Sequence, residues 1–402
     1  MKTTRREFLA QLAIGAGVGI LGCSDSPVTP LTITPAPITP ATSGLDHIVV
    51  VMMENRSFDH LLGWLPTADG KQAGLTYLDR GGVARQTQHL MDSRKCGFAN
   101  PAHSFSGGRV AYNNGNCDGW LRAGINDEFA IGFYNATDLA FFGQAAPQWT
   151  SLDRYFAAFL GPTYPNRLIL QAGQTDRIEN TLVVSTLPTI WDRLAAAGLA
   201  GRNYGSSLVS AHLFGGRYSS LIRPIASFFT DAGAGTLPEF SLIDPDFSPG
   251  IGNSDEPPDD IRDGEAFLAS VYRAVTTSPA WASTLLIITF DEWGGFFDHV
   301  PPPVAPIPRG ELDVGNVDGL RGFRVPTLLI SPFARRAVTS SKVYDHASIL
   351  RLIEWRWSLE PLTVRDENAN NLADELDFTR SLATAPVINV NTGPFGVVCP
   401  IG

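Results

Sequence analysis

Basic residues are scarce in this chain of 402 residues, where 30 Lys and Arg stand against 40 Asp and Glu for a formal net charge of −10. A protein that binds nucleic acid needs a basic surface to neutralise phosphates, and strong attachment to anionic lipid needs clustered Lys and Arg. The charge balance therefore argues against nucleic acid as a partner and against strong electrostatic adhesion to an anionic membrane.

Cysteine is rarer still, with Cys23, Cys96, Cys117 and Cys399 alone. Their spacings do not match a structural zinc site. Disulfides can form if the chain is exported, and a bridge between Cys96 and Cys117 would close a short loop. We therefore expect a structural disulfide in this pair and leave Cys399 as a free thiol.

Long apolar runs are absent after the first residues, so we expect no transmembrane helix in the rest of the chain. The segment from Thr4 to Leu9 carries paired arginines before Phe-Leu, and the stretch from Leu12 to Leu21 is apolar but too short to span a bilayer stably. An ordinary amphipathic helix is the alternative. Paired arginines directly before an apolar run are typical of a twin-arginine export signal.

The apolar stretch ends in Ile20-Leu21-Gly22-Cys23, which resembles a lipoprotein cleavage box except that Ile stands three residues before the cysteine. Lipidation of Cys23 is left open by this motif. We expect residues 1–23 to be a signal segment. The exported protein is then periplasmic, at the cell surface with or without a lipid anchor at Cys23, or secreted.

Composition divides the remaining chain. Residues 24–44 are rich in Pro and Thr with few charges, which is typical of an extended, solvated tether. Residues 45–385 alternate strand and helix patterns and form the main domain. Within it, residues 66–150 are rich in Gly, Asn and aromatics without clear periodicity, which predicts a loop-rich insertion beside the site. Residues 386–402 are a C-terminal tail.

Two short apolar runs in the main domain each end in a pair of oxygen-bearing side chains. Ile48–Met53 is followed by Glu54-Asn55, and Leu285–Phe290 is followed by Asp291-Glu292. Unbroken runs of this length indicate strands of a parallel sheet buried on both faces. Ligand sites in open α/β sheets form at the carboxyl ends of such strands. A third strand is expected over 325–330.

Helices are expected between these strands. One opens at Pro188 and can end at Gly198, another covers Glu265 to Val275 with helical apolar spacing, and a third follows Asp345 as its N-cap. Together with the strands they predict an α/β fold with a mostly parallel central sheet.

The paired side chains at the strand ends are hard oxygen ligands, which suit Ca²⁺, Mg²⁺ or Mn²⁺ and in mixed sets also Zn²⁺. Acids at strand ends often only cap the next helix. Because two such pairs accompany the Thr163–Arg167 segment, we favour a divalent-metal site made of Glu54, Asn55, Asp291, Glu292 and Thr163.

Thr163-Tyr164-Pro165-Asn166-Arg167 follows a Gly-Pro turn, and Pro165 suits the first turn of a helix. A helix N-terminus favours a developing alkoxide and bound phosphate, so Thr163 is the candidate nucleophile. Arg167 lies about one turn further and can support phosphate oxygens or metal ligands. The alternative is that Thr163 is only an N-cap.

These segments resemble the bacterial phosphoesterase family of phosphatidylcholine-type phospholipases C and acid phosphatases, in the alkaline phosphatase-like superfamily. The resemblance covers most of residues 45–380 and is strongest over 47–59, 161–167 and 291–302. It implies a three-layer α/β/α sandwich, a catalytic domain over 45–385 and a phosphothreonine intermediate on Thr163. The same spacing occurs in sulfatases with Cys or Ser at this position, but threonine cannot yield their aldehyde.

The resemblance also marks His299, His103 and His346, in that order of preference, as groups near the metal or phosphate. Histidine can protonate a leaving alcohol or hydrogen-bond phosphate. We interpret His47, His60, His89 and His212 as structural or surface residues.

One position departs from the family pattern. Family members carry a His before the Pro-Pro pair upstream of the second acidic strand, and here Glu256 precedes Pro257-Pro258. One phosphate or metal contact is therefore altered. Metal preference, activity or pH optimum can change with it.

The expected function is an exported, metal-dependent phosphoesterase of the phospholipase C type, acting on phospholipid headgroup diesters. The alternatives are an acid phosphatase acting on organic phosphate monoesters and a non-catalytic binding protein at the cell surface. Aromatics in the insertion can hold a choline headgroup by cation–π contact or simply pack, and we favour packing. They are Trp120, Phe129, Phe133 and Tyr134.

Overall fold

The computed structural model describes residues 39–91, 100–393 and 395. The expected signal segment with Cys23, most of the tether, Cys96 and Cys399 lie outside these residues. Among the described residues, no helix is both long and apolar enough to cross a bilayer.

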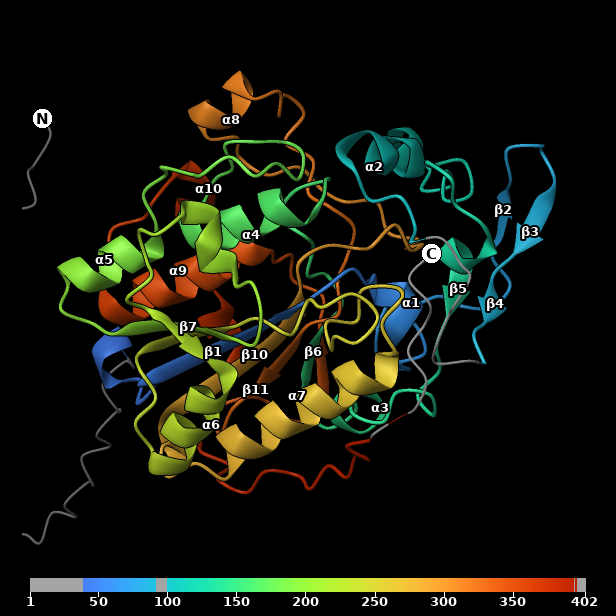
Figure 1. The fold of residues 1–402 in the computed structure, drawn as a ribbon. Coiled ribbons are helices and arrows are strands. Elements are labelled where there is room, and N and C mark those ends of the chain that lie inside the picture. The colour runs from blue at the N-terminus through green and yellow to red at the C-terminus, as the bar shows by residue number, and fades with distance from the viewer. Residues whose placement is uncertain (1–38, 92–99, 394, 396–402) are drawn as a thin grey trace, which may run out of the picture. The chain divides into compact units, whose positions relative to one another are not determined.

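An eight-stranded sheet runs through the main domain in the order β12-β6-β11-β10-β1-β9-β7-β8 (Figure 1). Pairing is parallel except that β11 is antiparallel to both of its neighbours. The strands are β1 His47–Met53, β6 Thr150–Leu152, β7 Gly201–Gly205, β8 Ile222–Pro224, β9 Phe240–Ile243, β10 Thr284–Phe290, β11 Leu328–Ile330 and β12 Val338–Ser340. The predicted mostly parallel sheet is confirmed.

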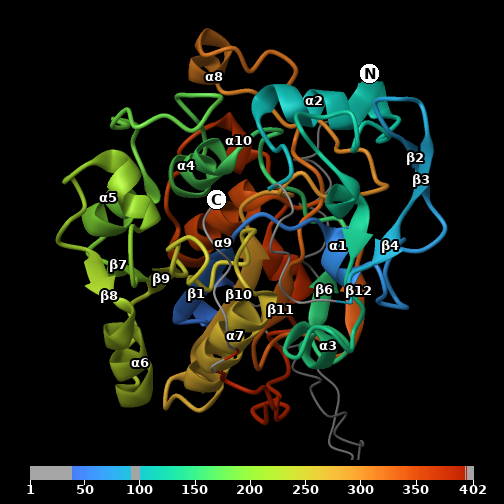
Figure 2. The ribbon, with the colours of Figure 1, turned by 45° about the vertical axis from the view of Figure 1, so that its right-hand side comes forward.

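Helices cover both faces of this sheet, as Figures 1 and 2 show, so the predicted three-layer α/β/α arrangement is confirmed. One face carries α4 Thr163–Ala172, α5 Ile190–Ala196, α9 His346–Trp357 and α10 Val364–Glu367, and the other carries α3 Phe142–Ala145, α6 Ile225–Ala234 and α7 Ile261–Thr276. The short helices α1 Phe58–Leu62, α2 Phe105–Tyr112 and α8 Arg309–Asp313 lie outside these layers.

Burial explains why the two central strands have no polar face. Residues Ile48–Met53 of β1 and every residue of β10 are buried, because helices cover both sides of the sheet. Unbroken apolar sequence is what such a position requires. These two strands therefore form the centre of the core and fix the position of the side chains that come directly after them.

The expected cap of α9 is confirmed, and three other predicted boundaries shift by two to four residues. Asp345 accepts the N–H of Ala347 as the cap of α9. The helix α5 begins at Ile190, two residues after the predicted Pro188, with Thr189 and Asp192 as its capping pair. The helix α7 begins four residues before the predicted Glu265, because the Asp260 side chain caps it. The strand expected over 325–330 is ordered as a strand only from Leu328, after Pro326, which has no N–H for a sheet ladder.

The segment from residue 66 to 149 contains only short elements among its described residues. They include the paired strands β2 Thr76–Leu78 and β3 Ala84–Gln86, and the paired strands β4 Gln88–His89 and β5 Gly132–Phe133. The four aromatic residues considered for cation–π contact with a choline headgroup are at most 6% exposed and pack in the hydrophobic core. They are Trp120, Phe129, Phe133 and Tyr134. The packing interpretation is thus confirmed, and the cation–π interpretation is wrong.

The predicted disulfide is not formed at Cys117, which is a free, buried thiol. The side chain packs with Trp120 and Leu121, and its sulfur points to the Gly115 carbonyl oxygen at 3.7 Å. Burial raises the pKa of the Cys117 thiol to about 12, so it stays protonated and unreactive near neutral pH.

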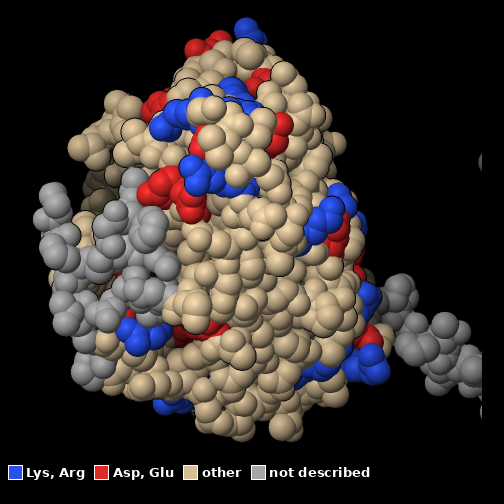
Figure 3. Space-filling model, turned by 90° about the vertical axis from the view of Figure 1, so that its right-hand side faces the viewer, with Lys and Arg blue, Asp and Glu red and all other residues tan. Residues whose placement is uncertain are grey.

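Surface charge is dispersed on the face turned to the viewer in Figure 3. Lys and Arg lie there in small groups, most of them beside Asp and Glu, among uncharged residues.

A buried carboxyl links the insertion to the core. Glu265 of α7 is 1% exposed, and its Oε2 accepts the N–H groups of Phe141 at 2.5 Å and Phe142 at 3.1 Å. Burial raises the pKa of Glu265 to about 8 although both N–H groups oppose the shift.

This pKa predicts a pH-dependent contribution to stability. The folded-state pKa of Glu265 lies above the ordinary value of 4.5. The contribution of Glu265 to the free energy of unfolding is therefore complete below pH 4.5 and is lost as the pH rises from 4.5 to about 8. We expect Glu265→Gln, which keeps an acceptor oxygen and cannot ionise, to gain in free energy of unfolding relative to the wild type across this window. Urea unfolding at pH 5, 7 and 9 measures the difference, and the exposed Glu360→Gln is the control. A difference independent of pH contradicts the prediction.

Candidate active site

The parallel register of β1 and β10 brings the two acidic pairs together. Met53 lies opposite Phe290, and the N–H of Asp291 donates to the Met53 carbonyl oxygen at 3.1 Å. Glu54-Asn55 and Asp291-Glu292 therefore leave the sheet side by side. All four are at most 4% exposed. The structure thus brings these residues together at the carboxyl ends of the two central strands, as the sequence predicted.

The backbone is shaped to let the two segments touch. Asn55 adopts a left-handed conformation with φ 60°, which Asn tolerates better than most residues. Gly294 comes after the second pair with φ 64°, and a Cβ there would lie 2.0 Å from the Asn55 carbonyl oxygen. Only glycine allows this close approach.

The Asn55 side-chain amide lies between two carboxylates, 2.9 Å from Glu54 Oε2 and 2.5 Å from Glu292 Oε1. With its nitrogen toward them, the amide donates to both carboxylates. With Oδ1 toward them, Nδ2 donates to Glu256 Oε1 at 3.3 Å, and the three oxygens that then face one another would be stabilised by a cation among them. Hard oxygen ligands of this kind are those that Ca²⁺, Mg²⁺ and Mn²⁺ prefer.

The electrostatics of the cluster agree with this interpretation. Burial, and after it repulsion from Asp291, raises the pKa values of Glu54 and Glu292 well above the ordinary range. A divalent ion would remove this repulsion and favour the ionised carboxylates.

Thr163 is the first residue of α4 and points into the cluster. The N-cap of α4 is Pro162, which forms no side-chain cap, so the alternative of Thr163 as an N-cap is wrong. Its hydroxyl instead donates to Glu54 Oε2 at 3.3 Å. The backbone N–H of Tyr164 is taken by Asn180 Oδ1 at 2.8 Å. The nucleophile candidate and the metal-ligand candidates therefore share one site.

Arg167, one turn further along α4, forms ion pairs with buried carboxylates. Its guanidinium contacts Glu54 Oε1 at 2.8 Å, Asp244 Oδ1 at 2.6 Å and Asp291 Oδ2 at 3.3 Å. Burial lowers the pKa of Arg167, but these acids raise it more, so the side chain stays charged. Of the two predicted roles, the structure favours support of the metal ligands.

Asp244 is a site residue that sequence reasoning missed. It comes directly after β9, the other neighbour of β1, and its Oδ2 accepts the Ser210 N–H, the Ser210 hydroxyl and the Asn203 amide. Phe240–Ile243 is also a short run ending in an acid, which is the signal that could have found it. Its role is to fix Arg167.

His103 comes from the insertion and faces the cluster. Its Nδ1 lies 2.7 Å from the Pro101 carbonyl oxygen, so Nδ1 carries the proton and Nε2 keeps a lone pair. Nε2 lies 3.9 Å from Glu292 Oε1. Burial lowers the pKa of His103. The ring can therefore accept a proton, or bind a cation, at the site.

His346 acts on the backbone of the site. It is fully buried, and its Nε2 lies 2.7 Å from the Asp291 carbonyl oxygen while Nδ1 meets the Tyr155 hydroxyl at 3.2 Å. Burial lowers the pKa of His346, which keeps the ring neutral. It fixes the second acidic strand end and does not line the cavity.

The preferred histidine, His299, belongs to a separate cluster. Its Nδ1 meets Asp59 Oδ2 at 2.5 Å and its Nε2 meets Asp69 Oδ1 at 3.2 Å. Burial lowers the pKa of His299, but Asp59 raises it more.

Asp59, Asp298 and His299 have ligand atoms close enough for a metal. Arg324 already neutralises this group, however, because it contacts Asp59 at 3.0 Å and Asp298 at 2.9 Å. We therefore interpret it as a structural ion-pair network.

Glu256, which the sequence analysis marked as a departure from the family pattern, adjoins Asn55. Its Oε1 accepts the Asn55 Nδ2 at 3.3 Å and the Asn100 Nδ2 at 3.0 Å. The first of these contacts holds the Asn55 amide with Oδ1 toward Glu54 and Glu292.

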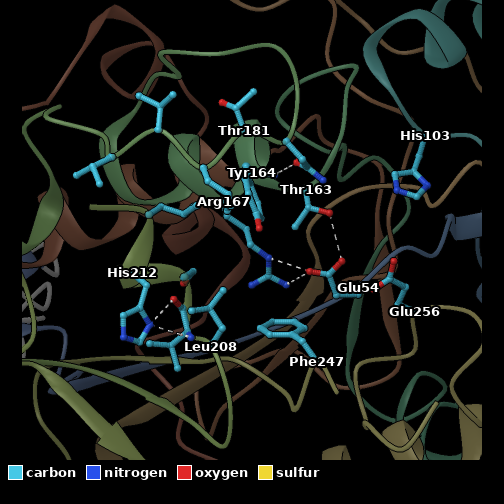
Figure 4. A pocket seen from close by; sticks show the side chains of 17 residues that line it. Glu54, His103, Thr163, Tyr164, Arg167, Thr181, Leu208, His212, Phe247 and Glu256 are labelled. Atoms are coloured by element: carbon cyan, nitrogen blue, oxygen red, sulfur yellow. Dashed lines mark hydrogen bonds and ion pairs between the residues drawn. The ribbon is translucent and has the colours of Figure 1, made fainter. Parts of the chain in front are cut away.

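A cavity of about 330 Å³ opens over Thr163. In Figure 4, His103 and Glu256 lie on one side of Glu54, and Leu208 and His212 lie on the other side of Arg167. His212, which sequence reasoning set aside, thus lines the cavity, as does Phe247. The other three histidines contact groups outside it: Pro238 for His47, Arg56 and Gly132 for His60, and Asp138 for His89.

Comparisons with known proteins agree with this geometry. The model of the Phosphoesterase family matches residues 45–360. Non-specific phospholipase C6 of Arabidopsis thaliana is 30% identical over 83% of this chain and 72% of its own length. Phospholipase C A of Mycobacterium tuberculosis is 29% identical over 89% of this chain and 81% of its own.

Among solved structures, a protein of the alkaline phosphatase superfamily from Vibrio parahaemolyticus matches 82% of this chain and 71% of its own at 10% identity, with a TM-score of 0.40. The fold assignment rests on the sheet topology. The predicted family and the predicted hydrolase acting on phosphoric ester bonds are confirmed.

The metal-ligand cluster predicts stabilisation by divalent ions. We expect Ca²⁺, Mg²⁺, Mn²⁺ or Zn²⁺ to stabilise the folded protein. When the concentration of the free ion is one hundred times the dissociation constant of the ion, the gain in free energy of unfolding should be about 2.7 kcal/mol. Glu292→Gln should raise the melting temperature of the metal-free protein, because repulsion is removed, and abolish the further rise with metal. Differential scanning fluorimetry after EDTA treatment measures both. A metal-dependent rise that persists in the variant contradicts the assignment.

Proposed function

Because this chain belongs to the phosphoesterase family, we propose that it cleaves phosphate diesters of the phospholipid headgroup type, with Thr163 as nucleophile and a divalent cation held by Glu54, Asn55, Asp291 and Glu292 beside it. The observation that carries the proposal is the Thr163 hydroxyl, which lies at a helix N-terminus within 3.3 Å of Glu54 Oε2. A cation bound there would lower the pKa of the hydroxyl and neutralise phosphate oxygens.

Thr163 Oγ1 attacks phosphorus, the bond from phosphorus to the alcohol oxygen breaks, and a phosphothreonine forms. Glu54 accepts the hydroxyl proton through its existing hydrogen bond. Water then attacks phosphorus, the bond from phosphorus to Oγ1 breaks, and the phosphate monoester of the headgroup leaves while Glu54 returns the proton to Thr163 Oγ1. His103 faces the same space with an unprotonated Nε2, so it can take the proton of the attacking water and return one to the alcohol in the next turnover. Arg167, fixed by Asp244, holds Glu54 and Asp291 in place.

We also propose that residues 1–23 direct export by the twin-arginine route, with 24–44 as a tether and Cys23 as a candidate lipid attachment site. The paired Arg5-Arg6 and the apolar stretch behind them support this. Export leaves the active site on the side of the membrane where environmental phospholipids and organic phosphates occur.

The nucleophile is tested by Thr163→Ala. Its kcat/KM for para-nitrophenyl phosphorylcholine should fall by at least about a thousandfold, because the attacking oxygen is gone. The wild-type activity should be lost in EDTA and return with a divalent metal. Thr230→Ala, an exposed threonine on α6, is the matched control. Turnover retained by Thr163→Ala would contradict the mechanism.

The same assay separates the substrate classes. Preference for para-nitrophenyl phosphate over the phosphorylcholine ester would favour the acid phosphatase alternative. Failure to cleave either compound under all metals and pH values would favour the binding-protein alternative.

Glu256 is proposed as a positioning residue for the cation. It accepts Asn55 Nδ2 and so turns Asn55 Oδ1 toward Glu54 and Glu292. Glu256→Ala should weaken divalent binding by about 10–100-fold, the usual effect of losing such a partner. Glu256→Gln keeps an acceptor and should recover most of the affinity. Calorimetric titration with Mn²⁺ measures this, and equal affinity in Glu256→Ala and the wild type contradicts the role.

A further inference from the structure

The cavity over Thr163 has an apolar side that the chemistry at phosphorus does not use. Together with Glu54, Thr163 and Arg167 it is lined by aliphatic side chains and one phenyl ring: Leu182, Val183, Val184, Leu208, Val209, Leu213 and Phe247. We call the four most exposed of these, Leu182, Val183, Val184 and Leu208, the apolar wall.

The apolar wall is exposed to an unusual degree. Leu182 is 89% exposed, Val183 67%, Val184 57% and Leu208 56%. Single exposed aliphatic residues are normal, but a contiguous exposed apolar group beside a cavity indicates a surface that binds something apolar.

The wall is held in place by its hydrogen bonds. Arg177 Nη1 donates to the Thr181 carbonyl oxygen at 2.6 Å, and the Ser185 N–H donates to the Leu213 carbonyl oxygen at 2.8 Å. Asn180 accepts the N–H of Tyr164, the residue after the nucleophile. The loop that carries Leu182–Val184 is therefore tied to the first turn of α4 and keeps its distance from Thr163.

The charged residues of the cavity argue against a second anionic group of the ligand on this side. The lining contains the carboxylates Glu54 and Glu256 and one guanidinium, Arg167. Arg167 is already engaged by Glu54, Asp244 and Asp291. No free cation among the lining residues is left to bind a second phosphate or a carboxylate of the substrate.

We propose that the apolar wall binds a long hydrocarbon chain carried by the phosphate ester, which makes the enzyme selective for lipid esters over small water-soluble ones. This rests on the proposed function, because the phosphate must sit at Thr163. A cavity of about 330 Å³ is near the lower limit for drug-sized ligands. It has room for the phosphoryl group and the adjoining part of the ester, and the rest of the chain must lie along Leu182–Val184.

The test compares two esters of one headgroup, water-soluble para-nitrophenyl phosphorylcholine and dihexanoylphosphatidylcholine below its micelle concentration. In the double variant Leu182→Ser/Val183→Ser, we expect kcat/KM for the lipid divided by kcat/KM for the aryl ester to fall at least about tenfold, chiefly through KM. Val387→Ser is the matched control, since Val387 is 79% exposed and lies outside the cavity. A ratio within twofold of the wild type overturns the proposal.

A binding experiment tests the apolar wall independently of catalysis, so that its failure can be told from failure of the proposed function. If the wild type cleaves neither ester, the proposed function fails, and Thr163→Ala is titrated with phosphocholine and with dodecylphosphocholine below its micelle concentration. We expect the dodecyl ligand to bind more tightly and the double variant to lose this gain. Equal affinity for the two ligands, or a gain that survives in the double variant, overturns the proposal. Adsorption to phosphatidylcholine vesicles without any gain for the monomeric ligand also overturns it.

Discussion

The site depends on one unbalanced electrostatic interaction. Four buried carboxylates, those of Glu54, Asp244, Asp291 and Glu292, meet a single guanidinium, Arg167. Burying unpaired carboxylates is costly, and the raised pKa values of Glu54 and Glu292 express that cost. Since the Arg167 guanidinium contacts Glu54, Asp244 and Asp291, the Glu292 side of the cluster is left for a cation. Under the proposed function a cation completes this arrangement, which the protein's own charges do not close into an ion-pair network.

The contrast with the Asp59–Asp298–His299 group makes this clearer. There, Arg324 contacts both aspartates and His299 contacts the first, so the charges are balanced within the protein. Both clusters contain two or more acids. Only in the first does a buried acid, Glu292, lie outside the contacts of the guanidinium. Counting acids therefore does not identify a metal site, whereas the balance of donors and acceptors does.

Periodicity and strand direction were enough to predict the centre of the sheet and the meeting of the two acidic pairs. The two short apolar runs predicted buried parallel strands, and the parallel register of β1 and β10 brings Glu54-Asn55 beside Asp291-Glu292. Asp244 was missed because β9 has four residues and gives a weak apolar signal. His299 and His103 both stand in family-like motifs, so the sequence did not distinguish them well, and His299 was placed first. Only the path of the insertion decides which of the two rings reaches the acidic pairs. The insertion itself has elements too short for periodicity to predict.

The cavity joins two ends with different physical requirements. Under the proposed mechanism, the end at Thr163 needs charge, low mobility and a cation, and its residues are fixed by a buried network. The end at Leu182–Val184 needs only apolar area and access, and its residues lie on a loop outside the sheet. Because the side chains of Leu182, Val183 and Val184 are exposed and take no part in the buried ion pairs, the proposed selectivity for the ester can diverge while the chemistry stays the same. Glu256 lies in the first end, where its hydrogen bond with Asn55 Nδ2 gives it a direct contact with the proposed cation ligands.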